Sequence, residues 1–390
     1  MTIENMRIHF YGVQGSGSIF PAKAERAETR LHSDLQLLEQ IFTQIKHGSS
    51  NGQINHTVEE IIGGPVNRKT LTKFREQFEL EEQRVYGGWT TCFRIETSDG
   101  NDIVFDCGSG FRICAGDIAA KWGMAEERNL YIFGSHAHFD HTEGFDQAAV
   151  CFDPRNNIHI LANHHYLKAL DQNLGIFSHH MDMDLKGIQT PLNYELMPAK
   201  FHSTEIRDLK IAPPTDDPMV HNFHDINEPI KIGNTTIQPF EVFHPDPCLA
   251  YRIEHNGKVF VFCTDHELRR GAEADDPLQK ASLEAEQRLI EQSMDADVLY
   301  RDGQFLQIEY DGHQGIGSAF GVSRLDWGHS CIEDVMDMAE KCRVGHTYIG
   351  HHDPNRTWAE KNWIDETLAR RSEQSGIKLE MAQAETIIDL

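Results

Sequence analysis

The chain has 390 residues, of which 39% are apolar, and its formal net charge is −25. This charge argues against an extended nucleic-acid surface, because such surfaces need clustered Lys and Arg to bind many phosphates. No stretch reaches the roughly 18 consecutive apolar residues of a membrane span. The eight cysteines form no CxxC pair, and the first residues lack the basic and then apolar pattern of a secretory leader. We therefore expect a reduced, cytoplasmic protein without a membrane partner.

The segment from residue 22 to residue 84 is predicted to be helical. Its apolar residues recur at steps of three and four, which is typical of an amphipathic helix. They are Leu31, Leu35, Leu38, Ile41 and Ile45. Residues 69–83 are predicted to form a second helix, after a turn at Gly63-Gly64-Pro65. Such an insertion serves as a dimer contact, as a lid over a site or as a solvated decoration, and its apolar face favours a homodimer.

The cluster His136-Ala137-His138-Phe139-Asp140-His141 follows a short apolar run, residues 130–133, which predicts a strand. This HxHxDH pattern places four metal-binding side chains within six residues. On a tight turn at a strand end, the two alternating imidazoles can face one metal ion while the Asp and the last His face another. The cluster therefore predicts a site for two metal ions.

Three further candidate ligands also follow apolar runs that indicate strands. They are His244 after residues 240–243, Asp265 after residues 259–264, and His351 after residues 347–350. An earlier run, residues 103–105, leads into Asp106 and a glycine-rich turn.

Taken in this order, the strands and the residues that end them resemble the metallo-β-lactamase superfamily, over about residues 7–353. The resemblance implies an α/β (α+β) fold, the αββα metallo-β-lactamase sandwich, with a helical insertion near the N-terminus. It also implies two ligand sets. One metal ion is assigned to His136, His138 and His244, the other to Asp140, His141 and His351, and Asp265 bridges the two.

The choice between His351 and His352 rests on the same resemblance. The family pattern has a His three residues before a Pro, and Pro354 therefore selects His351. Asp106 is expected to orient the cluster rather than to bind a metal. The expected cofactors are two divalent ions, with Zn²⁺ favoured, although Mn²⁺ and Fe²⁺ suit the same mixture of imidazole and carboxylate ligands.

Later segments resemble the phosphodiesterase branch of that superfamily, which contains tRNA 3′-end endonucleases and small cyclic-nucleotide phosphodiesterases. These segments are Asp302-Gly303-Gln304-Phe305, Trp327-Gly328-His329-Ser330-Cys331 with a helix over residues 332–341, and Gly350-His351-His352-Asp353-Pro354. The resemblance implies catalytic roles for Asp140, for His329 as general acid, and for Asp302 as the residue that orients His329. Gln14 and Trp89 stand where this branch usually has Arg and Asn, which leaves the substrate open.

The predicted organisation is a single domain over residues 1–390, because the candidate site residues run from Asp106 to His351. The helical insertion spans residues 22–84. A second, irregular insertion near the site is expected over residues 164–227, where prolines such as Pro213 and Pro214 occur. A helix over residues 358–375 and a strand over residues 378–381 are expected to end the fold.

These observations predict a dinuclear-metal phosphodiesterase in which a metal-bridging hydroxide attacks a small phosphodiester, with a 3′,5′-cyclic nucleotide as the favoured substrate. Three alternatives stay open. A hydrolase of a thioester, lactone or lactam would use the same metals without His329. A tRNA 3′-end endonuclease would need a Lys/Arg-rich protrusion, which the acidic chain is expected to lack. A metal-stabilised ligand sensor would bind without turnover.

Overall fold

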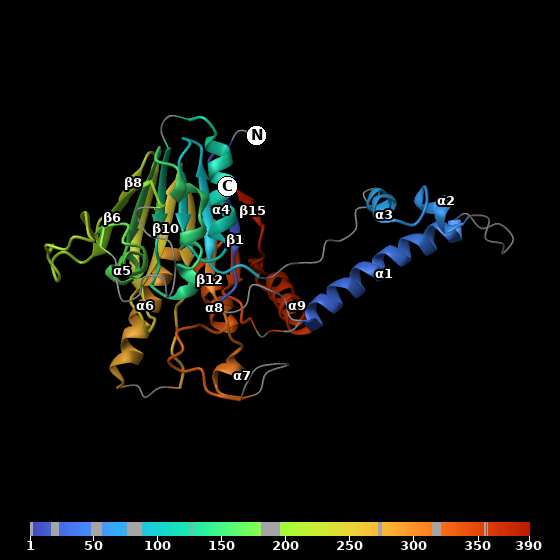
Figure 1. The fold of residues 1–390 in the computed structure, drawn as a ribbon. Coiled ribbons are helices and arrows are strands. Elements are labelled where there is room, and N and C mark those ends of the chain that lie inside the picture. The colour runs from blue at the N-terminus through green and yellow to red at the C-terminus, as the bar shows by residue number, and fades with distance from the viewer. Residues whose placement is uncertain are drawn as a thin grey trace. The chain divides into compact units, whose positions relative to one another are not determined.

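Two β-sheets form the centre of the larger part of the chain, which comprises Met1–Ile19 and Tyr86–Leu390 (Figure 1). Phe20–Val85 forms a second compact unit. The structure is a computed structural model. It describes residues 3–16, 23–47, 57–75, 88–125, 128–180, 196–271, 275–313, 321–354, 356 and 358–390.

The first sheet has eight strands in the order β15-β1-β2-β3-β4-β5-β6-β7. In chain order these strands are β1 (Met6–Gly12), β2 (Cys92–Thr97), β3 (Asp102–Phe105), β4 (Arg128–Phe133), β5 (Asn156–Ala162), β6 (Lys200–Arg207), β7 (Asn222–Asp225) and β15 (Ile387–Asp389). Neighbouring strands from β3 to β7 are parallel. Helices α4 (Phe111–Trp122) and α5 (His164–Leu174) pack on this sheet.

The second sheet has seven strands in the order β14-β13-β12-β11-β10-β9-β8. They are β8 (Ile230–Ile232), β9 (Thr235–Val242), β10 (Cys248–His255), β11 (Lys258–Cys263), β12 (Val298–Asp302), β13 (His346–Gly350) and β14 (Lys378–Met381). Neighbouring strands from β11 to β14 are parallel. This sheet carries helices α6 (Pro277–Ser293), α8 (Ile332–Cys342) and α9 (Trp358–Ser375), and a short helix α7 (Gln307–Tyr310) lies between β12 and α8 in the chain.

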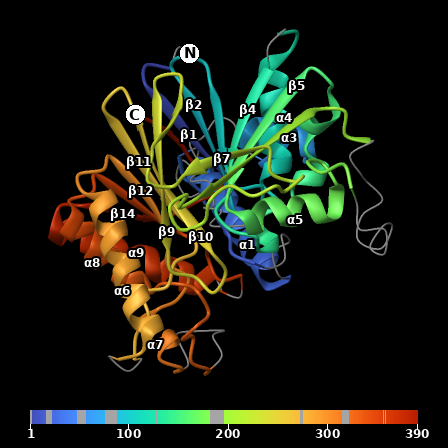
Figure 2. The same cartoon turned by 90° about the vertical axis from the view of Figure 1, so that its left-hand side faces the viewer.

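Figure 2 shows the four layers: α4 and α5 lie beyond one sheet, and α6, α8 and α9 beyond the other. Aromatic side chains join the sheets at the centre. The ring of Phe93 on β2 lies 4.3 Å from that of Tyr300 on β12 and 5.1 Å from that of Phe262 on β11. β2, β3 and β12 are buried at every position, as expected for central strands covered on both faces. The predicted αββα sandwich is confirmed.

The strand ends position the candidate site. The parallel strands β4, β11, β12 and β13 each run into one of its segments at the carboxyl end, and the β9–β10 turn adds another. Open α/β sheets generally bind ligands at the carboxyl ends of parallel strands. The αββα architecture therefore gathers residues from five distant parts of the sequence.

The segment predicted to be a helical insertion forms α1 (Lys23–His47), α2 (Val58–Ile62) and α3 (Arg68–Arg75). Thr57 and Glu60 form a capping box at the start of α2, and Gly63 ends this helix in the left-handed conformation at φ 79°. The second predicted helix, over residues 69–83, is therefore present as α3 up to Arg75. Its remainder lies outside the described residues.

Helix α3 is a basic element of the otherwise acidic chain. Its sequence RKTLTKFR holds four basic and no acidic residues, and the side chains of Lys69 and Lys73 are exposed. The net charge of the whole chain does not show this cluster, because it sums the charges of all 390 residues and not those of single segments.

The second insertion, predicted to be irregular over residues 164–227, contains one helix and two strands among its described residues. It contributes α5, and then β6 and β7, which extend the first sheet because β6 pairs in parallel with β5 and β7 with β6. Pro213 and Pro214 lie in the connection between β6 and β7. Strand β6 was missed because six of the eight residues of its sequence, KFHSTEIR, are polar and no apolar alternation is present.

All eight cysteines are buried free thiols, so packing accounts for their positions. None of the helices in the described ranges combines the length and the apolar character that a membrane crossing requires.

Candidate metal centre

One group of candidate ligands lies at the ends of three strands. His136 and His138 follow β4, His244 follows β9 and Asp265 follows β11, and one ligand atom from each lies within 4.8 Å of those of the others. His244 Nε2 is 3.2 Å from His138 Nδ1, and His136 Nε2 is 3.4 Å from Asp265 Oδ2. Three imidazole nitrogens and one carboxylate oxygen thus converge on one point, as in the predicted first ligand set.

The second group contains Asp140, His141 and His351. His351 Nε2 lies 3.3 Å from Asp140 Oδ2 and 3.2 Å from Asp265 Oδ1, and His141 Nε2 lies 3.3 Å from the same Asp265 oxygen. The two oxygens of Asp265 therefore face different groups, Oδ2 toward His136 and Oδ1 toward His141 and His351. This geometry fits the bridging role that the resemblance implied for Asp265.

The donor atoms suit cations. Within the described part of the chain, His136 Nε2, His141 Nε2 and Asp140 Oδ1 are buried and have no hydrogen-bond partner. Buried polar atoms normally have partners, because leaving them unpaired costs free energy. Divalent cations would satisfy all three, and imidazole with carboxylate is a donor set that Zn²⁺ and similar ions accept. The residues therefore fit divalent metal binding.

A second layer of residues orients these imidazoles. Asp106 lies at the end of β3 with φ 59°, and its Oδ2 is 2.7 Å from His141 Nδ1. Ser135 donates to Asp106 from its backbone N–H and from its hydroxyl, both at 2.7 Å. Because Asp106 holds Nδ1 of His141, the opposite nitrogen faces the metal position.

His244 is oriented by a backbone carbonyl. Its Nδ1 lies 3.0 Å from the oxygen of Gly328, where φ is +89°. A Cβ atom at residue 328 would lie 2.2 Å from that nitrogen, so both the conformation and the close approach require glycine.

The two adjacent histidines after β13 point to different partners. His351, at φ 53°, directs Nε2 into the second group, whereas Nε2 of His352 lies 2.7 Å from the carbonyl oxygen of Ala382. The geometry therefore favours His351, and not His352, as the candidate ligand.

The electrostatics of the cluster favour positive charge at the second group. Burial opposes a charge on His141, but Asp265 and Asp140 outweigh it and raise the pKa of His141 well above its usual value. Burial likewise opposes a charge on His351, and the same two carboxylates raise its pKa to about 9. Burial lowers the pKa of His136 well below its usual value, so this imidazole is neutral. Carboxylates that stabilise imidazolium would also stabilise a metal cation.

His329 lies beside the two groups. Its Nδ1 is 3.0 Å from Asp302 Oδ2, and its ring stacks on that of His351 at 4.6 Å between centroids. Its side chain is 13% exposed, whereas Asp302 is fully buried behind it. Asp302 also accepts hydrogen bonds from the backbone N–H groups of Gln304 and Ser330. Asp302 is therefore placed to position His329 rather than to reach a substrate.

Two residues near the site escaped the sequence-based prediction. Ser135 Oγ lies 3.1 Å from His136 Nδ1. Asp246 accepts from the backbone N–H of Ala137 at 3.2 Å and lies 2.7 Å from Nδ1 of His165. Each is within two residues of a predicted ligand, but Ser and Asp are so common in turns that this proximity alone does not identify them.

The comparison with protein families agrees with this geometry. The model of the beta-lactamase superfamily domain matches residues 101–352, which includes all the candidate ligands. The chain belongs to the metallo-β-lactamase superfamily. No curated protein matches it.

Several solved structures are similar to this chain. Zn²⁺-bound PqqB from Methylobacterium extorquens has 12% identity and a TM-score of 0.51, over 98% of this chain and 100% of that chain. The metallo-beta-lactamase fold protein YhfI from Bacillus subtilis has 14% identity and a TM-score of 0.48, over 99% of each chain. Human tRNase Z, short form, has 12% identity and a TM-score of 0.46, over 98% of each chain. At 12% identity, the likeness to PqqB shows the fold alone.

Proposed function

We propose that the chain is a metal-dependent phosphodiesterase that hydrolyses a small phosphodiester, with a 3′,5′-cyclic nucleotide as the favoured substrate. The observation that carries this proposal is His329. It is a partly exposed imidazole that stacks on His351 and is held from behind by the buried Asp302. Cleavage of a phosphodiester releases a strongly basic alkoxide unless an acid protonates it, and an imidazolium beside the metal centre meets that need.

The assigned metal ligands are His136, His138, His244 and Asp265 for one ion and Asp140, His141, His351 and Asp265 for the other. Two divalent ions, with Zn²⁺ favoured, would supply charge for the phosphate oxygens and would lower the pKa of a water nucleophile. Asp106, Ser135 and the Gly328 carbonyl hold the imidazoles in the orientation that this role needs.

His329 acts through its Nε2 atom in this proposal. When Nδ1–H donates to Asp302, the proton that can leave is on Nε2. The hydrogen bond to Asp302 fixes the orientation of the ring, so that Nε2 can deliver its proton to a leaving oxygen. Asp302 is thus a positioning residue, and His329 is the catalytic acid.

Two exposed aromatic side chains support a substrate with a planar base. Phe139 lies between His138 and Asp140 in the sequence and is 74% exposed. Trp327 precedes Gly328, whose carbonyl orients His244, and is 51% exposed. A nucleobase stacks well on an exposed aromatic ring, so these two side chains offer contacts for a planar base.

The direct test is hydrolysis of 3′,5′-cyclic AMP, 3′,5′-cyclic GMP and bis(p-nitrophenyl) phosphate by the metal-loaded protein. We expect turnover of a cyclic nucleotide and its loss in Asp140→Ala, with Asp295→Ala, an exposed carboxylate far from the ligands in sequence, as the matched control. A protein that binds two metals but hydrolyses none of the three substrates contradicts the proposal. Turnover of a thioester or lactone instead, unaffected by His329→Ala, would assign the other hydrolase class.

The basic helix α3 favours a second candidate function, that of a tRNA 3′-end endonuclease. The exposed Lys69 and Lys73 of this helix offer charge for RNA phosphates, which a tRNA 3′-end endonuclease needs. This candidate predicts cleavage of a precursor tRNA that falls steeply with salt and is weakened in the double variant Lys69→Ala/Lys73→Ala. The phosphodiesterase proposal predicts that this double variant leaves cyclic-nucleotide turnover unchanged.

A further inference from the structure

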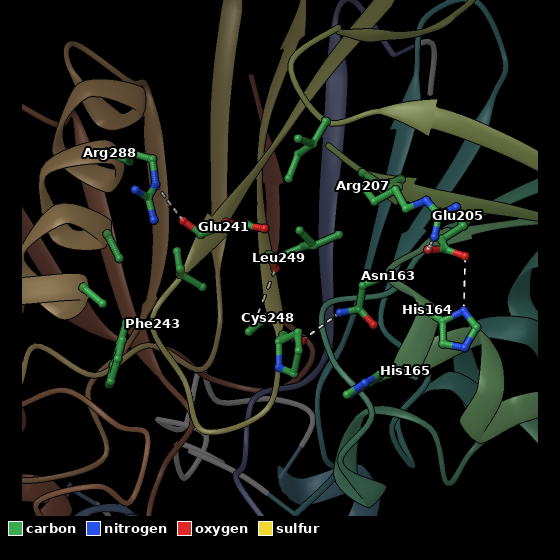
Figure 3. A pocket seen from close by; sticks show the side chains of 16 residues that line it. Asn163, His164, His165, Glu205, Arg207, Glu241, Phe243, Cys248, Leu249 and Arg288 are labelled. Carbon is green, nitrogen blue, oxygen red and sulfur yellow. Dashed lines mark hydrogen bonds and ion pairs between the residues drawn. The ribbon is translucent and has the colours of Figure 1, made fainter. Parts of the chain in front are cut away.

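A cavity of about 450 Å³ lies beside the metal centre but contains none of the candidate ligands. It is formed where the two sheets separate, between β6 of the first sheet, β9 and β10 of the second, and helices α5 and α6 (Figure 3). This volume falls within the range of small-molecule sites, which is roughly 300–1,000 Å³.

The floor of the cavity is apolar. It includes Ile206, Val242 and Leu249, which are all buried, and Ala285 on α6. At one end, Glu205 is only 2% exposed and is already neutralised, because Arg207 lies 3.0 Å from one of its oxygens and His164 Nδ1 lies 3.1 Å from the other. Neither the floor nor this end therefore offers a free charge to a ligand.

Arg288 on the α6 wall is different. In Figure 3 it lies on the opposite side of the cavity from His164, Glu205 and Arg207. Its Nε donates to the backbone oxygen of Glu241 at 3.2 Å, and no carboxylate among the described residues lies within ion-pair distance of its guanidinium. A guanidinium has five N–H donors in a planar fork, so four remain for a ligand, and the fork suits a carboxylate or a phosphate.

The cavity also contacts the residues that hold the metal loop. Asn163, which caps the N-terminus of α5, donates to the carbonyl oxygens of Ser135 at 3.0 Å and Pro247 at 2.7 Å. The sulfur of Cys248 lies 3.8 Å from His136 Nδ1. A molecule in the cavity would therefore touch side chains that pack directly against a candidate ligand and its loop.

We propose that this cavity binds a small amphipathic anion, with its acidic head on Arg288 and its apolar body on the Ile206, Val242 and Leu249 floor, and that its binding alters the metal centre. Apolar contact supplies most of the affinity, and the charged fork selects the acidic head. The contacts of Asn163 and Cys248 transmit the change to His136, and any effect on turnover rests on the proposed function.

Calorimetric titration of the full-length protein with decanoate, decyl phosphate and uncharged decanol tests the binding. We expect both anions to bind more tightly than decanol, and Arg288→Gln to weaken anion binding by roughly tenfold, because the variant loses the charge-assisted hydrogen bonds to the acidic head. Arg370→Gln, an exposed arginine on α9, is the matched control and should change nothing. Equal binding of the anions to wild type and Arg288→Gln, or binding of none of the three probes, overturns the assignment.

The variant Ala285→Leu, which fills part of the cavity, tests whether the probes bind in the cavity or elsewhere on the surface. It should weaken all three probes, since it occupies the floor, and unchanged binding would place the probes elsewhere. The visible spectrum of the Co²⁺-loaded protein then tests the coupling without turnover. The coupling is supported if saturation with decanoate changes the spectrum and if Arg288→Gln needs a higher decanoate concentration for the same change. An unchanged spectrum contradicts the coupling. A failure to hydrolyse phosphodiesters would contradict the proposed function, but the calorimetric and spectral tests of the cavity would still be valid.

Discussion

Asp265 is the residue on which both ligand groups depend, because its two oxygens face different histidines. We predict that Asp265→Asn lowers the metal content of the purified protein below the two ions expected for wild type, since the amide is a weaker and uncharged ligand. Elemental analysis after dialysis measures this directly. Asp295→Asn, at a 65% exposed side chain, is the control. Two ions per chain in Asp265→Asn would refute the bridging role.

Phe139 tests whether the substrate carries a base. Base–aromatic stacking is worth about 1–3 kcal/mol, so Phe139→Ala should raise KM for a cyclic nucleotide while kcat changes little. Met124→Ala removes an apolar side chain that is 86% exposed at a different place and should have no effect. Steady-state kinetics with cyclic AMP distinguish the two, and an unchanged KM in Phe139→Ala argues against stacking.

At the scale of single residues, the sequence predicted the candidate ligands and two orienting residues, Asp106 and Asp302, but not Ser135 and Asp246. His136, His244 and His351 each stand at the end of an apolar run, and that pattern is local. Ser135 and Asp246 act through contacts with partners that are 29 and 109 residues away, Asp106 and Ala137. Such contacts depend on tertiary structure, and the residue types alone do not mark them.

Among the elements, α6 and β12 are tied by a buried ion pair. Arg301 is fully buried and its Nη2 lies 2.7 Å from Glu286, which also contacts His266 at 2.9 Å. We predict that Glu286→Gln destabilises the fold by about 3–5 kcal/mol, because it leaves the Arg301 charge uncompensated. Urea unfolding measures this. The exposed pair of Arg343 and Asp295 is the control, and its loss should cost about 0–1 kcal/mol.

The same pair has a pH dependence. Burial alone would raise the pKa of Glu286, but Arg301 and His266 outweigh it and lower the pKa from 4.5 to about 2. A carboxylate with a lowered pKa in the folded state contributes its full stability above its unfolded value of 4.5 and loses it as the pH falls toward 2. Unfolding curves of wild type and Glu286→Gln should therefore converge over that interval, and a constant separation would contradict this assignment.

The elements that the sequence predicted well are the apolar ones. Residues 259–264 and 347–350 correspond to β11 and β13, which are buried almost throughout. β6 was missed because its sequence is mostly polar and lacks the apolar alternation that indicates a strand. Regular structure there is set by pairing with β5, which no local pattern in the sequence encodes.

For the whole molecule, charge is distributed unevenly. Residues 22–84 hold nine Lys and Arg and ten Asp and Glu, so their formal charge is −1 out of a total of −25. The rest of the chain would repel a second copy, whereas the insertion would not. Its helix α1 exposes Leu35, Leu38 and Phe42, the last at 64%. We therefore propose that α1 is the contact of a homodimer.

This proposal predicts a dimer in light scattering after gel filtration, and a monomer for Phe42→Asp, which places a charge on the apolar face. Met124→Asp introduces the same charge at another exposed position and should stay dimeric. A wild-type monomer at micromolar concentration would contradict the proposal and would favour the lid or decoration that the sequence also allowed.

The architecture as a whole was predictable because the order of the motifs, strand by strand, matched one superfamily. The αββα sandwich followed from that order, and the metal groups followed from where the strands end. The cavity at Arg288 was not predictable. Its walls come from β6, β9, β10 and α6, and only the folded chain brings them together.

The measurement that tests the account most directly is the effect of His329→Ala on two substrates with different leaving groups. General acid catalysis contributes about 10²–10⁴-fold when the leaving oxygen is strongly basic. We predict such a loss of kcat with 3′,5′-cyclic AMP, a much smaller loss with bis(p-nitrophenyl) phosphate, whose leaving group needs no proton, and unchanged metal content. Equal losses with both substrates, or no loss with either, would contradict the assignment of His329 as the acid.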